Sequence, residues 1–259
     1  MHSRSFREEQ RTKDRGRFRK RESDIHQKLS FQDFRELYRQ GKDSNIISLA
    51  YDIRNKSIST DIFNVDEDLT FISCLDNEVM NNICEICHTY KDLSYKKFQI
   101  LAPMYKGLNG IDEINKNVQE IFNPKNKNKK ETKITDVLFR EEDKVIQLTN
   151  MPDDNVYNGD IGLIDTISSG TKKEIMIDFD SNVVKYTPAN FNNFRLAYSI
   201  SIHKSQGSEF DVVVIPIVRG YNKMLYQKLI YTAVTRAKKK LYLIGDVNAL
   251  RYAANNDKD

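Results

Sequence analysis

Two apolar runs predict the strands around which the chain is organised. Residues 210–217 and 241–244 are almost continuously apolar and rich in β-branched side chains. This pattern is typical of strands buried on both faces of a parallel sheet. Between them, apolar residues recur at three- and four-residue spacings over 224–235, which predicts a helix. We expect a βαβ unit whose loop-end polar residues form a ligand site, as in open α/β sheets.

The spacing of apolar residues, together with one capping residue, predicts further helices and strands in the rest of the sequence. Helical spacing of apolar residues predicts helices near residues 31–38, 46–53, 78–90 and 247–254. Ser44 precedes the second of these helices and is a plausible N-cap. Residues 98–102 are apolar apart from one position and predict another buried strand.

The pattern changes over residues 134–188, where short β runs alternate with tight turns. The runs cover residues 144–148, 160–167, 174–179 and 183–186. Turn residues such as Asn158-Gly159 separate them. Four short strands with tight turns predict a small antiparallel barrel. We expect the large sheet to resume at 194–200, so that residues 29–133 and 189–259 form one α/β domain interrupted by this barrel.

Charge is clustered along the chain, although the formal net charge is only +4. Residues 1–21 hold nine Lys or Arg against three acids, and residues 124–133 hold five Lys against one Glu. Such clusters attract phosphates; alternatively, both are solvated, disordered segments. Residues 1–28 contain scarcely any apolar side chain, so we expect a disordered basic arm.

Composition excludes several classes of protein. No apolar run approaches the ~18 residues that a membrane-spanning helix needs, so we expect no membrane partner. Three cysteines without an export signal indicate free thiols and a cytoplasmic location. The C-E-I-C-H segment at Cys84–His88 matches the pattern of covalent haem attachment. The helical stripe over 78–90 accounts for both of its cysteines, so we expect no haem and no metal site.

Two segments resemble motifs of superfamily-one helicases. S-I-H-K-S-Q-G-S-E-F-D at 201–211 resembles motif V, and Y-T-A-V-T-R-A-K-K-K-L at 231–241 resembles motif VI. Tyr38-Arg39-Gln40 resembles motif IV and precedes both in the expected order. The combination is most similar to the RecD-like, 5′-to-3′ DNA helicases. This resemblance implies a RecA-like parallel-sheet domain and an SH3-like fold for the barrel, which is either a passive module or a DNA contact.

The resemblance also implies roles in ATP hydrolysis. Arg236 corresponds to the arginine finger of motif VI, and Arg39 to the motif IV arginine aimed at the same phosphate. A guanidinium fork suits the charge that develops on a departing γ-phosphate. Glu209 resembles the carboxylate that accepts a hydrogen bond from the ribose. Gln206 and Gly207 shape the turn beside it.

A second set of residues is expected to contact single-stranded DNA. By resemblance this set is Pro103, Met104, Lys106, Ser201, His203 and Lys204. The first three lie in A-P-M-Y-K-G, after a predicted strand, where proline and glycine let backbone amides approach a phosphate. The alternative interpretation is an ordinary loop between a strand and a helix. Outside this motif, His203 would be interpreted as an ordinary loop histidine whose ring nitrogens have hydrogen-bond partners.

The chain departs from the helicase pattern in one respect. It contains no G-x-x-x-x-G-K-[ST] sequence to hold the phosphates, and no Asp-Glu pair closing an apolar strand to hold magnesium. We therefore expect ATP with Mg²⁺ to be held mainly by a P-loop-containing N-terminal motor domain that is missing or acts in trans. The chain alone is then inactive. The alternative is a non-catalytic module that binds single-stranded DNA.

Overall fold

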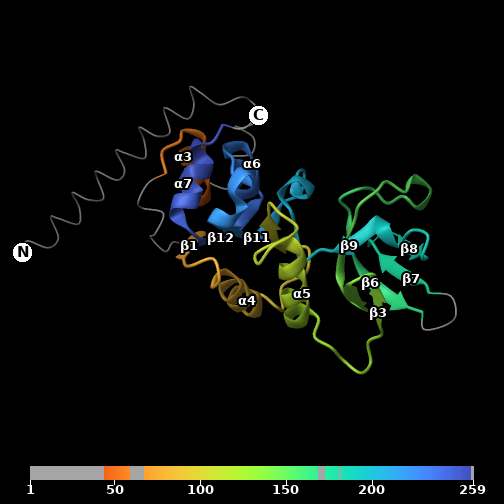
Figure 1. Cartoon of the computed structure of the whole chain (residues 1–259). Coiled ribbons are helices and arrows are strands. Elements are labelled where there is room, and N and C mark those ends of the chain that lie inside the picture. The colour runs from red at the N-terminus through yellow and green to blue at the C-terminus, as the bar shows by residue number, and fades with distance from the viewer. Residues whose placement is uncertain (1–43, 59–66, 169–172, 181, 258–259) are drawn as a thin grey trace, which may run out of the picture.

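The computed structural model describes residues 44–58, 67–168, 173–180 and 182–257. Its larger part is a five-stranded sheet in which every neighbouring pair is parallel (Figure 1). In spatial order the strands are β1 (Leu69–Ser73), β12 (Ala237–Gly245), β11 (Phe210–Ile217), β2 (Phe98–Ala102) and β10 (Ser199–Ser201). The predicted elements at residues 98–102, 210–217 and 241–244 are therefore strands of one sheet.

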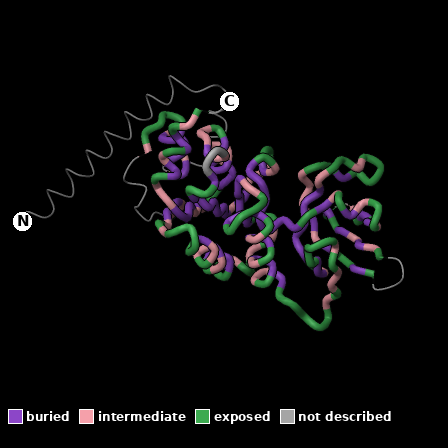
Figure 2. Tube along the Cα trace, in the orientation of Figure 1, coloured by how far each residue is buried: buried purple, intermediate pink, exposed green. Residues whose placement is uncertain are grey.

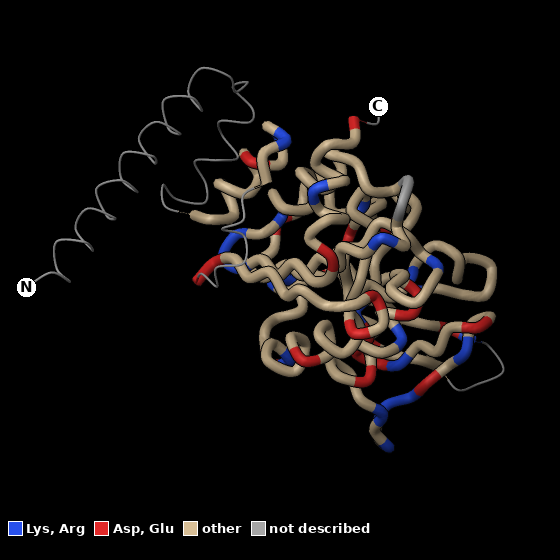
Figure 3. The backbone as a smooth tube through the Cα atoms, turned by 60° about the vertical axis from the view of Figure 1, so that its left-hand side comes forward, with Lys and Arg blue, Asp and Glu red and all other residues tan. Residues whose placement is uncertain are grey.

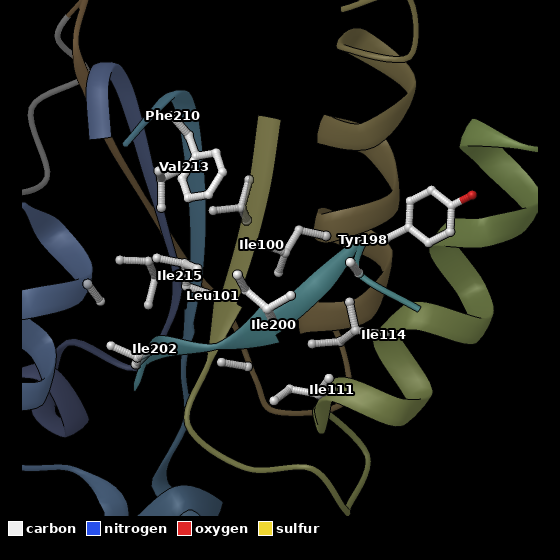
Figure 4. Close-up of a cluster of buried hydrophobic side chains, with 14 of the residues drawn as sticks. Ile100, Leu101, Ile111, Ile114, Tyr198, Ile200, Ile202, Phe210, Val213 and Ile215 are labelled. Carbon is white, nitrogen blue, oxygen red and sulfur yellow. The ribbon is translucent and has the colours of Figure 1, made fainter. Parts of the chain in front are cut away.

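The central strands carry the core of this domain. All five residues of β2 are buried, and so is every residue of β11 except Asp211. Figure 4 shows side chains of β2, β10 and β11 meeting those of a flanking helix, among them Ile100, Ile200 and Ile114. Burial on both faces explains why these strands lack polar alternation.

In the described residues, five helices flank the parallel sheet. They are α3 (Asn45–Arg54), α4 (Val79–Thr89), α5 (Ile111–Phe122), α6 (Gln227–Val234) and α7 (Val247–Asn255). Short 3-10 turns are η2 (Pro152–Asp154), η3 (Phe191–Asn193), η4 (Ile202–Ser205) and η5 (Arg219–Met224). Helices α3, α6 and α7 pack together on one side, and α4 packs against α5 on the other (Figure 1). The predicted stripe of α4 is confirmed, with Cys87 buried beside Val79, Ile83 and Ile86.

The start of α3 differs from expectation in its capping group. Ser44 occupies the N-cap position but accepts no hydrogen bond from the helix. Its hydroxyl instead donates to Asp68 Oδ2 at 2.6 Å. Asp68 also accepts from Asn45 Nδ2 at 3.0 Å and from the backbone N–H of Ile46 at 3.3 Å. A carboxylate from the segment before β1 therefore caps α3, which ties the helix to the sheet.

The barrel forms a second, antiparallel sheet. In order its strands are β8 (Val183–Tyr186), β7 (Ile175–Asp178), β6 (Ile161–Ile167), β5 (Lys144–Gln147) and β9 (Phe194–Leu196). The rings of Tyr186 on β8 and Phe194 on β9, at opposite edges of the sheet, lie 4.9 Å apart between centroids. Their packing closes the core, and Figure 2 shows buried segments on the strands of this unit. The predicted fold class, a parallel α/β domain interrupted by a small β unit, is confirmed.

The chain returns to the large sheet later than we expected. Residues 194–200 were assigned to the parallel sheet, but β9 pairs with β5 of the barrel. Only β10 joins the parallel sheet, beside β2. Both strands are only three residues long and mix polar with apolar residues, so their local pattern does not distinguish the two partners. The crossing from barrel to large sheet therefore falls at Ala197 and Tyr198.

A hairpin begins in the last three residues of the basic segment 124–133, for which disorder was one of two interpretations. Strands β3 (Glu131–Ile134) and β4 (Val137–Arg140) pair as an isolated two-stranded sheet. Arg140 anchors this hairpin with a side chain that is 1% exposed. Its guanidinium donates to Glu131 Oε1 at 2.6 Å and to Glu120 Oε1 at 3.0 Å. Residues 131–133 are therefore ordered by a buried cation.

A buried lysine joins the barrel to the parallel sheet. Lys144 lies at the start of β5, and its ammonium donates to Phe98 O at 2.9 Å and to Gln99 Oε1 at 2.8 Å, both on β2. The ring of Phe210 lies 5.9 Å from the Lys144 ammonium. Burial lowers the pKa of Lys144 to about 7, because charge is disfavoured away from water.

The stability of the protein should therefore depend on pH through Lys144. Between pH 7 and pH 10 the unfolded chain binds more protons at this residue than the folded chain, so the free energy of unfolding rises with pH, by up to about 1.4 kcal/mol per unit. The Lys144→Met variant should lack this contribution. Urea unfolding of both proteins across this range would measure it, and parallel pH profiles would contradict the assignment.

Some sequence predictions fall outside the described residues. They are the basic arm at 1–28, the helix near 31–38 and Arg39. Within the described ranges, no helix is long and apolar enough to cross a membrane.

Candidate nucleotide and nucleic-acid site

One cavity of about 580 Å³ opens at the amino ends of β11 and β12. It is lined by Gln206, Gly207, Glu209, Tyr231, Thr232, Thr235, Arg236 and Lys238. The first three precede β11, and the others come from the end of α6 and the start of β12. We expected a ligand site formed by the polar residues at the loop ends of these strands, without specifying which end. The cavity lies at the amino ends, because the turns that precede the strands carry these polar residues.

Strand pairing brings these two segments together. The backbone N–H of Phe210 donates to Arg236 O at 2.9 Å, and Phe210 faces Ala237 across the strand pair. Gly207 has φ +86°, a left-handed conformation that other residues rarely adopt. The turn before β11 therefore lies against the turn before β12. Four predicted nucleotide residues, Gln206, Gly207, Glu209 and Arg236, share this cavity.

Arg236 is held against the cavity wall. The residue is 8% exposed, and its guanidinium donates to Thr232 O, Ser208 O and Thr235 Oγ1, each at 3.1 Å. Thr232 O is a carbonyl of the last turn of α6, where a cation is favourable. The side chain is thus ordered before any ligand arrives, which reduces the entropy lost on binding.

Glu209 and Lys238 form an ion pair at the same cavity. Lys238 Nζ lies 3.1 Å from Glu209 Oε2, and the two side chains are 49% and 24% exposed. With Arg236, the cavity has two cations and one carboxylate. Figure 3 shows both acidic and basic residues over the described part of the chain. This local excess of positive charge favours an anionic ligand.

The residues predicted to bind DNA gather at the other ends of the strands. Strands β2 and β10 pair in parallel with Ala102 opposite Ser201. The loops that follow, one carrying Pro103, Met104 and Lys106 and the other carrying Ser201, His203 and Lys204, therefore begin side by side. The structure brings this set together at the carboxyl edge of the sheet, while their assignment to DNA stays a prediction.

These six residues differ in exposure. Pro103 is buried, and Met104 packs half-buried against the core. Lys106 extends into solvent with its side chain 88% exposed and lies 2.9 Å from Asp112 Oδ2. Its position leaves it accessible to a phosphate.

The remaining three residues surround η4. The Ser201 hydroxyl accepts a hydrogen bond from the backbone N–H of Lys204 and so caps η4. Lys204 donates its ammonium to the side-chain oxygen of Asn158, which belongs to the barrel. Burial lowers the pKa of Lys204. His203 is exposed, so His203 and Lys106 are the most open of the set.

Sequence reasoning missed three cavity residues. Tyr231, Thr235 and Lys238 line the cavity but received no role at the site. The spacing of Tyr231, Thr232 and Thr235 at the end of α6 places them on one side of the last turn, and that spacing was the available signal. Arg39, the second predicted catalytic arginine, lies outside the described residues.

Comparison with known proteins identifies two regions. Residues 114–179 match the family described as the ATP-dependent RecD-like DNA helicase SH3 domain. Residues 196–244 match the UvrD-like helicase C-terminal domain. The first match begins within α5 and includes the β3–β4 hairpin, and the second contains the cavity residues.

Curated relatives agree with these matches. An ATP-dependent RecD2 DNA helicase of Deinococcus radiodurans is 33% identical over 161 residues, which are 62% of this chain and 22% of the relative. The RecBCD enzyme subunit RecD of Buchnera aphidicola (Acyrthosiphon pisum) is 26% identical over 235 residues, 81% of this chain and 38% of the relative. The chain thus spans well under half the length of either relative.

A solved structure of Bacteroides Pif1 bound to single-stranded DNA aligns with 85% of this chain and 52% of its own, at a TM-score of 0.47 and 15% identity. The family matches and the curated relatives show more specifically than this solved structure which proteins the chain is similar to. It is similar to the SH3 domain of RecD-like helicases over residues 114–179 and to the UvrD-like helicase C-terminal domain over residues 196–244.

Proposed function

We propose that the chain is the C-terminal motor part of an ATP-dependent DNA helicase that unwinds in the 5′-to-3′ direction. One observation carries this proposal: Gln206, Gly207, Glu209 and Arg236, from two separate segments, line a single cavity. The direction of unwinding is taken from the resemblance to the RecD-like family.

On the nucleotide side, Arg236 would place its guanidinium on the γ-phosphate. Positive charge there stabilises the transition state of phosphoryl transfer. Glu209 would accept a hydrogen bond from the ribose, in competition with its ion pair to Lys238. The sequence contains no P-loop, so we assign the phosphate cradle and Mg²⁺ to a separate motor domain. Arg39 is proposed to approach the same phosphate.

On the DNA side, the loops after β2 and β10 would hold single-stranded DNA. Lys106, His203 and Lys204 would contact phosphates, and Pro103, Met104 and Ser201 would shape the two loops. Closure of the nucleotide cleft and its reopening would alternate the grip of the two motor domains on the strand. The loop after β10 begins at the carboxyl edge of the sheet and continues directly into Gln206 and Gly207 at the cavity, so this loop would couple the two sites.

Reconstitution of ATP hydrolysis tests this function. The purified chain alone should show no DNA-stimulated ATP hydrolysis, because it supplies only part of the site. Adding the separately purified P-loop motor domain of a RecD-like relative should restore it. Robust ATP hydrolysis by the chain alone would refute the proposal that the ATPase site is divided between this chain and a separate motor domain. Binding of single-stranded DNA without turnover in any mixture would favour the non-catalytic binding module.

A further inference from the structure

We propose that Tyr105, supported by Arg195, is a position where a base of the bound strand stacks. The inference rests on the proposed binding of single-stranded DNA and adds a contact to a base. The residues assigned above act through charge, hydrogen bonds and loop shape. Aromatic side chains beside a basic groove are the usual means by which proteins hold single strands without reading sequence.

The backbone around Tyr105 is fixed by its own loop. The N–H of Asp112 donates to Tyr105 O at 3.1 Å, and the N–H of Ile111 donates to Met104 O at 2.9 Å. A Cβ atom at Gly110 would lie 2.5 Å from Tyr105 O, so only glycine allows this close approach. The start of α5 thus anchors the loop, and the ring is displayed from a rigid support.

Packing against the core does not explain why an aromatic residue occupies position 105. Tyr105 is 37% exposed, in contrast to its neighbour Met104, which packs against the core. Large aromatic side chains left accessible beside charged residues are typical of binding surfaces. Tyr105 is therefore available to a ligand.

Arg195 supports the ring from the barrel. Its guanidinium carbon lies 5.2 Å from the Tyr105 ring centroid, within the range of a cation–π interaction. Arg195 is exposed on β9. Within the described part of the chain, Arg195 forms no salt bridge, so its charge is not neutralised there by an acid. The guanidinium can thus orient the ring and attract the phosphate next to a stacked base.

The surroundings fit a nucleic-acid strand. Lys106 follows Tyr105 directly, and the loop leaves β2 beside the β10 end that carries His203 and Lys204. A strand lying along this edge would place phosphates on the cations and one base on the Tyr105 ring.

Fluorescence anisotropy with a labelled oligothymidine tests the contact on the whole chain. Tyr105→Ala should weaken binding by roughly 5- to 100-fold, the usual effect of losing one stacked base, whereas Tyr105→Phe should bind like the wild type. Tyr252→Ala is the matched control, because Tyr252 is also exposed, at 51%, but lies on α7. It should leave binding unchanged.

An abasic oligonucleotide separates stacking from charge. Wild type and Tyr105→Ala should bind it with similar affinity, because it keeps the phosphates but lacks the bases. Arg195→Gln should weaken binding to both oligonucleotides and lower the dependence on salt. If Tyr105→Ala binds oligothymidine like the wild type, or loses affinity equally for both oligonucleotides, the stacking contact is refuted. Failure of the wild-type chain to bind either oligonucleotide would instead refute the proposed DNA-binding function on which the contact depends.

Discussion

Replacing Arg236 with alanine should lower DNA-stimulated ATP hydrolysis by about 10³-fold or more, in an assembly that includes a P-loop motor domain. The guanidinium lies at the cavity and is the charge best placed to meet a γ-phosphate held by another domain. Binding of single-stranded DNA should change little, because Arg236 lies at the amino end of β12, whereas the predicted DNA residues follow the carboxyl ends of β2 and β10. Steady-state hydrolysis and oligonucleotide binding measured on the same preparations would show this separation.

The variant needs controls, because Arg236 also has a structural role. Its hydrogen bonds to Thr232 O and Ser208 O hold the end of α6 against the turn before β11. Arg236→Lys keeps a positive charge without the planar fork, so it should recover little activity. Lys239→Ala removes a nearby exposed cation that pairs with Asp211 and should leave hydrolysis unchanged. Equal loss of hydrolysis and DNA binding in Arg236→Ala would indicate that Arg236 only maintains the fold.

Strands β2, β11 and β12 of the parallel sheet were predictable because their apolar runs are visible locally, whereas β1 was not predicted. Strands β2 and β11 are covered on both faces, so nearly every residue is apolar and the run itself marks the strand. The apolar stripe of α4 was predictable for a similar reason, since the residues of its buried face recur at three- and four-residue spacings. Partner choice was not predictable for β9, because three residues alternating buried and exposed suit either sheet.

Buried charges were the main feature that local patterns could not show. Arg140 and Lys144 are almost fully buried, yet in the sequence they look like ordinary surface residues. Their partners lie far away along the chain, on α5 for Arg140 and on β2 for Lys144. Burial of a charge depends on these distant acceptors, so the sequence did not indicate that these two residues are buried.

The candidate site was predictable from its motifs, but its position on the sheet was not. Motif resemblance selected Glu209 and Arg236, and the pairing of β11 with β12 brings their segments together. Polar residues at the loop ends of the strands indicated a ligand site, but the sequence did not indicate at which edge of the sheet the cavity would lie.

Replacing Asp143 with alanine should lower the free energy of unfolding by about 3 to 5 kcal/mol. The side chain is fully buried between the barrel and the large domain. It accepts hydrogen bonds from Gln119 Nε2 at 2.6 Å, Asn123 Nδ2 at 2.7 Å, the backbone N–H of Arg140 at 2.6 Å and the Tyr198 hydroxyl at 3.0 Å. Alanine would leave all four donors buried without this acceptor. Urea unfolding monitored by circular dichroism would measure the loss.

The chemistry of the Asp143 carboxylate, beyond its volume, should account for most of this effect. Asp143→Asn keeps the shape but replaces one accepting oxygen with a donor, so it should be destabilised nearly as much as the alanine variant. Asp211→Ala is the matched control, because Asp211 pairs with the exposed Lys239 and such pairs contribute under about 1 kcal/mol. Burial raises the pKa of Asp143, against the opposing effect of its hydrogen bonds. A small loss in Asp143→Ala, comparable with that of Asp211→Ala, would mean that the barrel and the large domain are joined mainly by apolar packing.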